Sequence, residues 1–451
     1  MARIVIIPTR IRAVSSPHLE LARRLVEAGH EVHYIGPPAS EGPAAEVGAA
    51  FIELQGLALH EWLPPGGSTV ARLVRFPTAW RGRTARLDEQ VDRFEVDRAQ
   101  ATLRTLAPDL VVTDHENFAQ LTAARVEGIR ALATTTWSHP FKRRNKPPLD
   151  TSVVPGRGVI GSTVGIELVW LRHRLRRLAW GAFAFVRDGG ADLASIQRHM
   201  VRRHGLSPRH ELDPWQWLRP AYFRRVPHMG LSFASFDFPG DDHPSFHRAC
   251  AIIPTIDDGR IDGELRVFVD ANAATGRPLL YLSMGAFAAG SAADLMRRAL
   301  DGLAGRPDWD VVVGLGGGDP AELESACPDN VLLVGFAPQL ELLARADVAV
   351  VHGGINSMNE ALRHGTPIVN YPFPGVMDQE GTGARVVAHQ VGVVGDRGTD
   401  TAEQIVGRIQ AVLTDPMYRT NAERMANAMA DEEVGDPPVR VVESFLEEAA
   451  P

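Results

Sequence analysis

Short apolar runs alternate with amphipathic stretches along the first part of the chain. Four runs have the length of buried strands: 3–8, 31–35, 110–113 and 131–135. The stretches at 17–28 and 118–127 place apolar residues at helical spacing. Strands that alternate with helices are typical of a parallel sheet covered on both faces. The pattern therefore predicts a first doubly wound α/β domain.

The same rhythm returns in the carboxy-terminal half. Strand-like runs occur at 278–283, 310–313, 330–334, 347–351 and 367–371, and helical spacing at 292–303 and 357–363. These runs predict a second doubly wound domain at 265–430, and the first domain then covers 1–250. A Pro-, Gly- and Asp-rich stretch at 237–254 is the expected linker. A terminal helix within 431–451 is expected to pack back on the first domain.

Composition narrows the class of protein. The 451 residues are 45% apolar and 23% charged, with a formal net charge of −8, which is typical of a soluble globular chain. The acidic excess argues against general nucleic-acid binding. The two cysteines, Cys250 and Cys327, have neither metal-ligand spacing nor a disulfide framework, so a cytoplasmic location is expected. No apolar run reaches the length of a membrane span.

The densest polar signal lies at 348–379, which reads VAVVHGGINSMNEALRHGTPIVNYPFPGVMDQ. A tight turn follows the strand and contains His352, Gly353 and Gly354. The next helix is expected to begin near Asn356 or Ser357, and a helix start with glycines before it suits a diphosphate. His352, Asn356 and Ser357 add side-chain donors. The alternative is that Ser357 and Glu360 form a capping box and only satisfy the helix end.

Other polar residues follow neighbouring strands. Asp378 and Gln379 follow a strand and a loop, while Phe336 and Gln339 follow another strand. Because strand ends of a parallel sheet share one edge, these residues are expected to bring together a carboxylate, two amides and an aromatic face. A nucleotide-sugar requires such groups beside a phosphate site.

These motifs resemble the UDP-glycosyltransferases, which include antibiotic, plant natural-product and glucuronosyl enzymes. The likeness covers most of the chain and is strongest from 278 to 394. It implies the α/β fold GT-B, two Rossmann-like domains that face a central cleft. It further implies a hexosyltransferase-type glycosyltransferase in natural-product biosynthesis, antibiotic biosynthesis included. We expect an inverting reaction that moves sugar from a UDP-sugar or dTDP-sugar to a small apolar or aromatic acceptor.

The resemblance implies a role for each donor-site residue. Phe336 would stack on the base, Gln339 would lie near base and ribose, and Glu360 would bind ribose hydroxyls. The diphosphate would be held by His352, Gly353, Gly354, Asn356 and Ser357, near the strand-end glycine turn at Gly285. Asp378 and Gln379 would bind sugar hydroxyls. The Asp308-Trp309-Asp310 segment runs into a strand and is expected to be structural, so no metal and no cofactor beyond the co-substrate are expected.

The catalytic base is the point where the chain departs from the family. Asp114 matches the aspartate that orients a catalytic histidine, but the position of that histidine holds Val14. The expected substitute is His18, and the alternatives are Asp114 itself, His115 or an acceptor that needs no strong base. Two other functions stay open: a nucleotide-sugar 2-epimerase, and a non-catalytic donor-binding partner of another transferase.

The segment at 141–230 interrupts the rhythm with helical and aromatic stretches. Residues 142–225 hold 17 Lys and Arg against 6 Asp and Glu. Within them, 166–186 reads as a basic amphipathic helix with interspersed tryptophans. Three interpretations are open: a wall of the acceptor cleft, peripheral contact with a membrane, or binding of an anionic acceptor.

Overall fold

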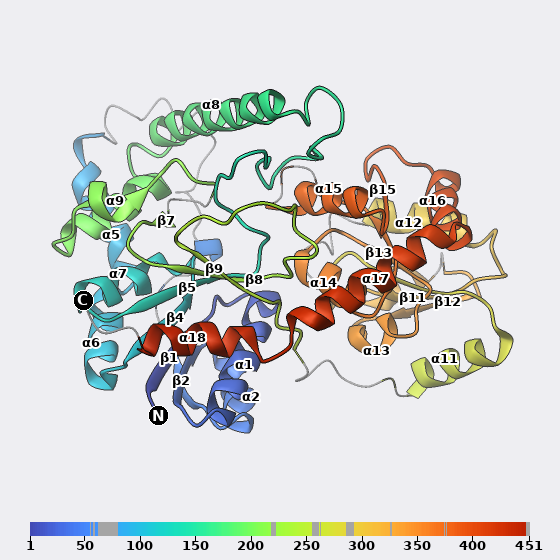
Figure 1. Ribbon diagram of the computed structural model, residues 1–451, viewed down its shortest axis with the longest axis horizontal. Helices are drawn as coiled ribbons and strands as arrows, with labels where there is room; N and C mark the ends of the chain where they lie inside the picture. Colours follow the sequence, from blue (N-terminus) through green and yellow to red (C-terminus); the bar gives the residue numbers. More distant parts are fainter. Residues whose placement is uncertain are drawn as a thin grey trace.

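The computed structural model contains two parallel sheets, one in each half of the chain (Figure 1). It describes residues 1–54, 56, 59–61, 80–217, 222–254, 261, 263–285, 293–324, 327–373, 375 and 377–447. Ala286, which directly follows Gly285, lies outside the described residues.

The first sheet has the strand order β3-β2-β1-β4-β5-β8-β9, and all its pairs are parallel. Its strands are β1 (Arg3–Ile7), β2 (Glu31–Gly36), β3 (Ala50–Glu53), β4 (Leu110–Asp114), β5 (Ala131–Thr135), β8 (His228–Leu231) and β9 (Phe246–Ala249). The sequence pattern missed β3, β8 and β9, and β9 lies within the stretch expected to be the linker. These three strands have only four residues each and mix polar with apolar side chains, so they lack the long apolar run of a central strand.

Helices cover both faces of the first sheet. One apolar layer packs under α1 (Arg12–Glu27) and α2 (Glu41–Glu46). The opposite layer packs under α5 (Arg83–Asp92), α6 (Val96–Leu106), α7 (Phe118–Val126) and α9 (Leu193–Arg203). Also described in this half are the long α8 (Thr163–Arg187), the short α10 (Pro208–Glu211), and the antiparallel pair β6 (Leu212–Asp213) and β7 (Tyr222–Phe223).

Helix α1 begins five residues before the predicted start at Pro17, so the proline lies inside the helix. Proline often marks the first helical turn because it lacks an N–H group, which made Pro17 the expected start. The earlier turn forms because the N–H groups of Val14 and Ser15 both donate to the carbonyl of Ile11. The residues around Val14 and His18 are therefore helical.

The second sheet has the strand order β12-β11-β10-β13-β14-β15, again with parallel pairs. Its strands are β10 (Leu279–Ser283), β11 (Asp310–Gly314), β12 (Val331–Val334), β13 (Val348–Val351), β14 (Ile368–Asn370) and β15 (Gly392–Val394). The helices are α11 (Gly263–Thr275), α12 (Ala293–Leu303), α13 (Gln339–Leu343), α14 (Ile355–Arg363), α15 (Gln379–His389), α16 (Ala402–Thr414) and α17 (Pro416–Glu432). Strands such as β13 are buried along their whole length because helices cover both faces.

The chain then returns to the first half. Helix α18 (Pro437–Glu447) contacts α1, β8 and β9, and Figure 1 shows it running beside α1. Its Val439 and Val442 are buried in the same apolar layer as α1.

Loops that follow the carboxyl ends of the two sheets meet each other. The backbone N–H of Gly381, near the start of α15, donates to the carbonyl of Leu149, in the loop after β5, at 2.9 Å. A Cβ added to Gly381 would lie 2.1 Å from that oxygen, so only glycine permits this approach. The carboxyl edges of the two sheets therefore face a common region.

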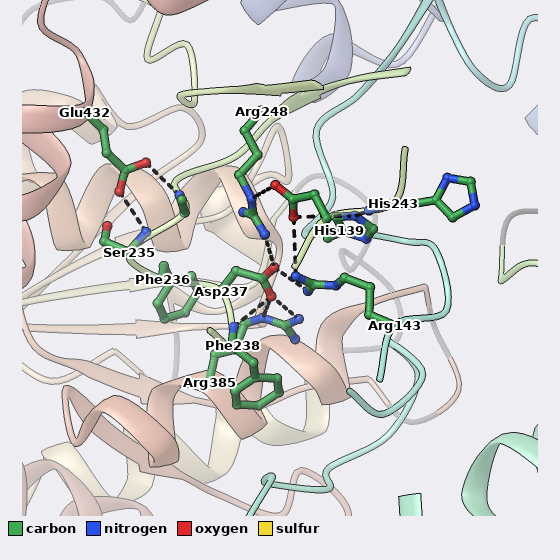
Figure 2. A network of polar contacts seen from close by, with 12 residues as sticks. His139, Arg143, Ser235, Phe236, Asp237, Phe238, His243, Arg248, Arg385 and Glu432 are labelled. Carbon is green, nitrogen blue, oxygen red and sulfur yellow. Dashed lines mark hydrogen bonds and ion pairs between the residues drawn. The ribbon is translucent and has the colours of Figure 1, made fainter. Parts of the chain in front are cut away.

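A buried ionic cluster joins the two halves beside this contact (Figure 2). Asp237 accepts hydrogen bonds from Arg385 of α15 at 2.6 Å, from Arg143 at 2.6 Å and from Arg248 at 3.0 Å. Burial would raise the pKa of the Asp237 carboxyl, but the three guanidinium groups, Arg385 foremost, hold that pKa well below its usual range. Such a cluster is strongly destabilised when one partner is removed, because a buried charge is left alone.

Candidate active site

The crevice of the second sheet lies where its strand order reverses. From β10 the chain continues to β11 on one side, while β13 pairs with β10 on the other side. Open α/β sheets bind ligands outside the carboxyl ends of strands at such a point. Gly285 follows β10 and His352 follows β13. The structure thus places both predicted donor-site residues at the switch point of the sheet.

The two neighbouring glycines make room for the His352 ring. A Cβ at Gly285 would lie 2.6 Å from Cε1 of His352, and one at Gly354 would lie 2.6 Å from Nε2. Burial lowers the pKa of His352 to about 4, although the backbone at Ser283 partly offsets this effect. The imidazole is therefore neutral at pH 7. Its Nδ1 is buried without a hydrogen-bond partner among the described residues.

Helix α14 begins at Ile355, and its N-cap is Gly354, which has no side chain to cap the first turn. The capping-box alternative is therefore wrong, because Ser357 lies inside the helix and not at its N-cap. Gly353 has φ +91°, and a Cβ there would lie 2.9 Å from Oδ1 of Asn370. The turn thus requires glycine, and the helix start carries no side-chain cap.

Three predicted residues lie together on one side of this helix start. Nε2 of Gln339 donates to Oγ of Ser357 at 3.2 Å and also bonds to Glu360. The Tyr281 hydroxyl donates to Oε1 of Gln339 at 3.0 Å, which fixes the orientation of the amide. The structure therefore brings Gln339, Ser357 and Glu360 into one hydrogen-bonded group. Asn356 lies in the same first turn.

Phe336 follows β12 and presents its ring to solvent, with 69% of the residue exposed. The ring lies close to the loop after β11, since a Cβ at Gly317 would be 3.1 Å from Cζ of Phe336. A cavity opens beside this loop and is lined in part by Met284, Gly285, Gly314, Leu315 and Gly318. An exposed aromatic face at a strand end suits stacking on a flat ring.

Asp378 and Gln379 occupy the start of α15 and have different surroundings. Asp378 is buried, and its Oδ2 has no hydrogen-bond partner among the described residues. Burial raises the pKa of Asp378 to about 6. Oε1 of Gln379 accepts from the backbone N–H of Phe373 at 2.9 Å, so this amide also holds the preceding loop.

The sequence did not single out two buried carboxamides. Asn370 ends β14 and is fully buried, while Asn359 lies in α14. In the part of the chain that the structure describes, neither amide group has a hydrogen-bond partner. Buried amides normally find partners, so these groups are available to a polar ligand or to water. In the sequence, Asn370 is the polar residue that ends the apolar run of β14, and only this position could have drawn attention to it.

The first sheet has its own switch point, between β1 and β4. Asp114 is the last residue of β4 and is buried, with Oδ1 accepting from the backbone N–H of Glu116 at 2.9 Å. Burial raises the pKa of Asp114, and it raises the pKa of Glu116 as well, with the charge of Asp114 adding to that rise. The two carboxyl groups therefore retain protons closer to neutrality than free carboxyls do.

His18 lies on the same face of the first sheet as Asp114. Its Nε2 is 2.6 Å from Oγ1 of Thr134, which is the register partner of Asp114. Its Nδ1 is 2.7 Å from the carbonyl of Val14, one turn earlier in α1. The side chain is fully buried, and burial lowers its pKa to about 4. The His18 ring is therefore enclosed within the fold and not solvated.

His115 lies beside an aromatic wall. Its ring is 4.5 Å from that of Trp137, and the Trp137 ring is 4.9 Å from that of Trp217, both edge to face. Trp137 packs against an apolar cluster of the first half and also against the cluster that forms the core of the second half. The wall therefore stands where the two halves meet.

The Asp-x-Asp segment is engaged in local contacts. Asp308 pairs with Arg306 at 2.7 Å, and Trp309 is buried beneath that guanidinium group. Oδ2 of Asp310, the first residue of β11, accepts from Asn272 at 3.0 Å. These contacts engage both carboxylates with neighbouring protein groups.

Comparison with known proteins places these features in a wider group. Residues 297–447 match a family described as erythromycin biosynthesis protein CIII-like, C-terminal domain. A demethyllactenocin mycarosyltransferase from Streptomyces fradiae is 34% identical over 177 residues, which are 39% of this chain and only 37% of the relative. A 4'-demethylrebeccamycin synthase from Lentzea aerocolonigenes is 25% identical over 464 residues, covering 99% of this chain and 100% of the relative. The crystal structure of the glycosyltransferase of kitacinnamycin has a TM-score of 0.69 at 19% identity and covers 98% of each chain.

Proposed function

We propose that this chain, which belongs to the UDP-glycosyltransferase family of natural-product type, transfers a sugar from a UDP-sugar or dTDP-sugar to a small apolar or aromatic acceptor. Its fold is GT-B, as predicted from the sequence. The observation that carries the proposal is the His352 turn. A half-buried, neutral imidazole, two glycines fitted around it and a helix start without a side-chain cap lie together at the switch point of the second sheet.

These groups suit the departure of a nucleoside diphosphate. Negative charge develops on the diphosphate as its bond to the sugar breaks, and preorganised N–H donors stabilise that charge. A neutral His352 still donates one N–H, and the start of α14 adds backbone donors and its dipole. We also propose that the reaction needs no metal ion. The contacts of Asp308 and Asp310 support this part of the proposal, because they engage both carboxylates with protein groups.

The acceptor half supports displacement by an acceptor hydroxyl. Trp137 and Trp217 offer an apolar wall beside Asp114 and His115, at the switch point of the first sheet. Attack from this side, with the diphosphate leaving on the other side, inverts the anomeric centre. Asp114 is proposed to orient and charge-stabilise the group that removes the proton.

The test is to incubate the chain with UDP-glucose or dTDP-glucose, with and without phenol. We expect nucleoside diphosphate and a phenyl glycoside of inverted configuration only when phenol is present, measured by chromatography and proton NMR. Isomerised nucleotide-sugar without phenol would instead identify an epimerase. Donor binding with neither product would identify a non-catalytic partner.

Of the three interpretations of 166–186, the surface of α8 favours peripheral contact with a membrane. Large apolar side chains face outward along the whole helix, at Val164, Leu168, Leu171, Leu175, Leu178 and Trp180. Arg172 and Arg176 are exposed beside them, and Figure 1 shows α8 lying along the outside of the molecule. None of the described helices is long and apolar enough to cross a bilayer. An apolar line with flanking cations suits the interface of an anionic membrane.

Vesicle flotation tests this contact. We expect binding to vesicles that contain anionic phosphatidylglycerol and loss of that binding in Leu171→Glu/Leu175→Glu. Equal flotation of the variant and the wild type would contradict membrane contact. If the substitutions instead changed how the protein sediments without vesicles, the apolar face of α8 would mediate self-association.

A further inference from the structure

The histidine that follows β4 has the geometry of a general base. We propose that Nε2 of His115 takes the proton of the acceptor, in place of the catalytic histidine that the family resemblance would place at Val14. This inference rests on the proposed transferase function and assigns a catalytic residue to it.

The hydrogen-bond partners of the ring determine its tautomer. Nδ1 of His115 is 3.2 Å from the carbonyl oxygen of Thr134 and 3.5 Å from Oδ1 of Asp114. A carbonyl oxygen can only accept, so Nδ1 carries the hydrogen and Nε2 carries the lone pair. Among the described residues, that Nε2 has no hydrogen-bond partner, although only 5% of the side chain is exposed. A general base requires an unused lone pair, which Nε2 provides, and a carboxyl group near the ring, which Asp114 provides on the Nδ1 side.

His18 lacks this property. Its Nδ1 donates to the carbonyl of Val14, so its Nε2 must accept from the hydroxyl of Thr134 at 2.6 Å. Both nitrogens are therefore engaged inside the fold. His18 would have to break the bond to Thr134 before it could accept a proton from a substrate.

The surroundings of His115 favour the neutral ring before reaction. Burial lowers its pKa, while the charge of Glu116 and the carbonyl of Thr134 oppose that shift. The other titratable groups that face it are Asp114, His18 of α1 and His228 of β8. At neutral pH the ring is uncharged, and the nearby carboxyl groups stabilise the imidazolium that forms during transfer.

The proposed step balances without a further reactant. The acceptor O–H bond breaks and its proton goes to Nε2 of His115. The oxygen forms a bond to the anomeric carbon, and the bond from that carbon to the diphosphate oxygen breaks. The electron pair leaves with the nucleoside diphosphate, and the imidazolium later releases its proton to water.

An acceptor series separates a lost base from a lost structure. The experiment measures kcat/KM of wild type, His115→Ala and His115→Gln with phenol, 4-chlorophenol and 4-nitrophenol, using UDP-glucose and dTDP-glucose. Removing a general base costs on the order of a hundredfold with a weakly acidic hydroxyl. We expect that loss with phenol and a progressively smaller loss as the phenol becomes more acidic, because an acidic phenol needs less help. Added imidazole should partly restore His115→Ala.

Two matched variants complete the design. His18→Ala removes a buried histidine next to the same threonine, and we expect any loss to be equal for all three phenols. His352→Ala should likewise reduce all three equally. The inference would be overturned if His115→Ala and His115→Gln lost activity equally with all three phenols, or if both kept full activity. Either result would leave the transferase function intact. A wild type that forms no glycoside with either donor would overturn the proposed function and this inference with it.

Discussion

The switch points of the two sheets differ in whether their polar side chains already have hydrogen-bond partners. At the switch point of the second sheet, the proposed donor side, Asn370 and Asp378 are buried and His352 is half-buried, and each has a buried polar atom without a partner in the described structure. At the acceptor side, His18 and Asp114 are already hydrogen-bonded to neighbouring protein groups. Buried polar groups without partners destabilise a fold unless a ligand satisfies them. We therefore expect the donor side to bind a polar ligand. We expect the acceptor side to bind an apolar ligand that makes a single polar contact.

The largest expected effect concerns the cluster that joins the two sides. In Asp237→Ala the buried guanidinium groups of Arg143 and Arg385 and the half-buried one of Arg248 lose their shared carboxylate. We expect the free energy of unfolding to fall by about 3 kcal/mol, measured by urea denaturation. Asp242→Ala is the matched control, because that carboxylate contacts Arg248 but is 30% exposed, and it should cost much less. Equal losses would show that burial does not set the strength of the cluster.

The next effect tests the donor side. His352→Ala removes a preorganised donor from the proposed diphosphate site, and we expect kcat to fall by on the order of a hundredfold. His364→Ala, at the other end of α14, should leave kcat unchanged. Turnover that survives in His352→Ala would place the diphosphate elsewhere.

A smaller effect is expected at Asp114. Asp114→Asn keeps the shape but cannot stabilise a neighbouring imidazolium, so kcat should fall by about tenfold, or 1.4 kcal/mol. The raised pKa of Asp114 means that its ionised form disfavours the fold, a cost that grows as the pH rises toward that pKa. The variant should therefore gain stability over wild type from pH 5 to pH 8 in urea denaturation. A gain in acid instead would contradict the direction of the pKa shift.

The smallest effect concerns base stacking. Phe336→Ala removes an exposed ring at the edge of the donor site, and KM for the donor should rise by about fivefold, as expected for one aromatic contact. Phe336→Trp should lower KM, because tryptophan offers a larger face. Exposed Phe183 of α8 is a control, since Phe183→Ala should leave KM for the donor unchanged.

The donor side was largely predictable because its residues follow one another along a single stretch of chain. The order of a strand, a glycine turn and a helix places His352 and Ser357 near each other whatever the rest of the protein does. Five of the six strands of the second sheet were predicted for the same reason, since each lies in an apolar run, whereas the three-residue β15 was missed. Asn370 escaped notice because nothing local marks an asparagine as buried without a partner.

The acceptor side depends on contacts between distant segments. The sequence could not show that His18 bonds to Thr134, because 116 positions separate them. The short strands β8 and β9 and the charge cluster at Asp237 likewise form only when separate segments meet. For the same reason, the choice between His18 and His115 required the hydrogen bonds of each ring.

Calorimetric titration with UDP, dTDP and GDP tests the donor site most directly. The bonded group of Gln339, Ser357 and Glu360 suits a pyrimidine nucleotide, and Glu360 favours the complete ribose diol of UDP. We expect UDP to bind most tightly, dTDP next and GDP least, with binding of UDP weakened in His352→Ala. Tightest binding of GDP, or UDP affinity unchanged in His352→Ala, would contradict a pyrimidine diphosphate site at the switch point of the second sheet.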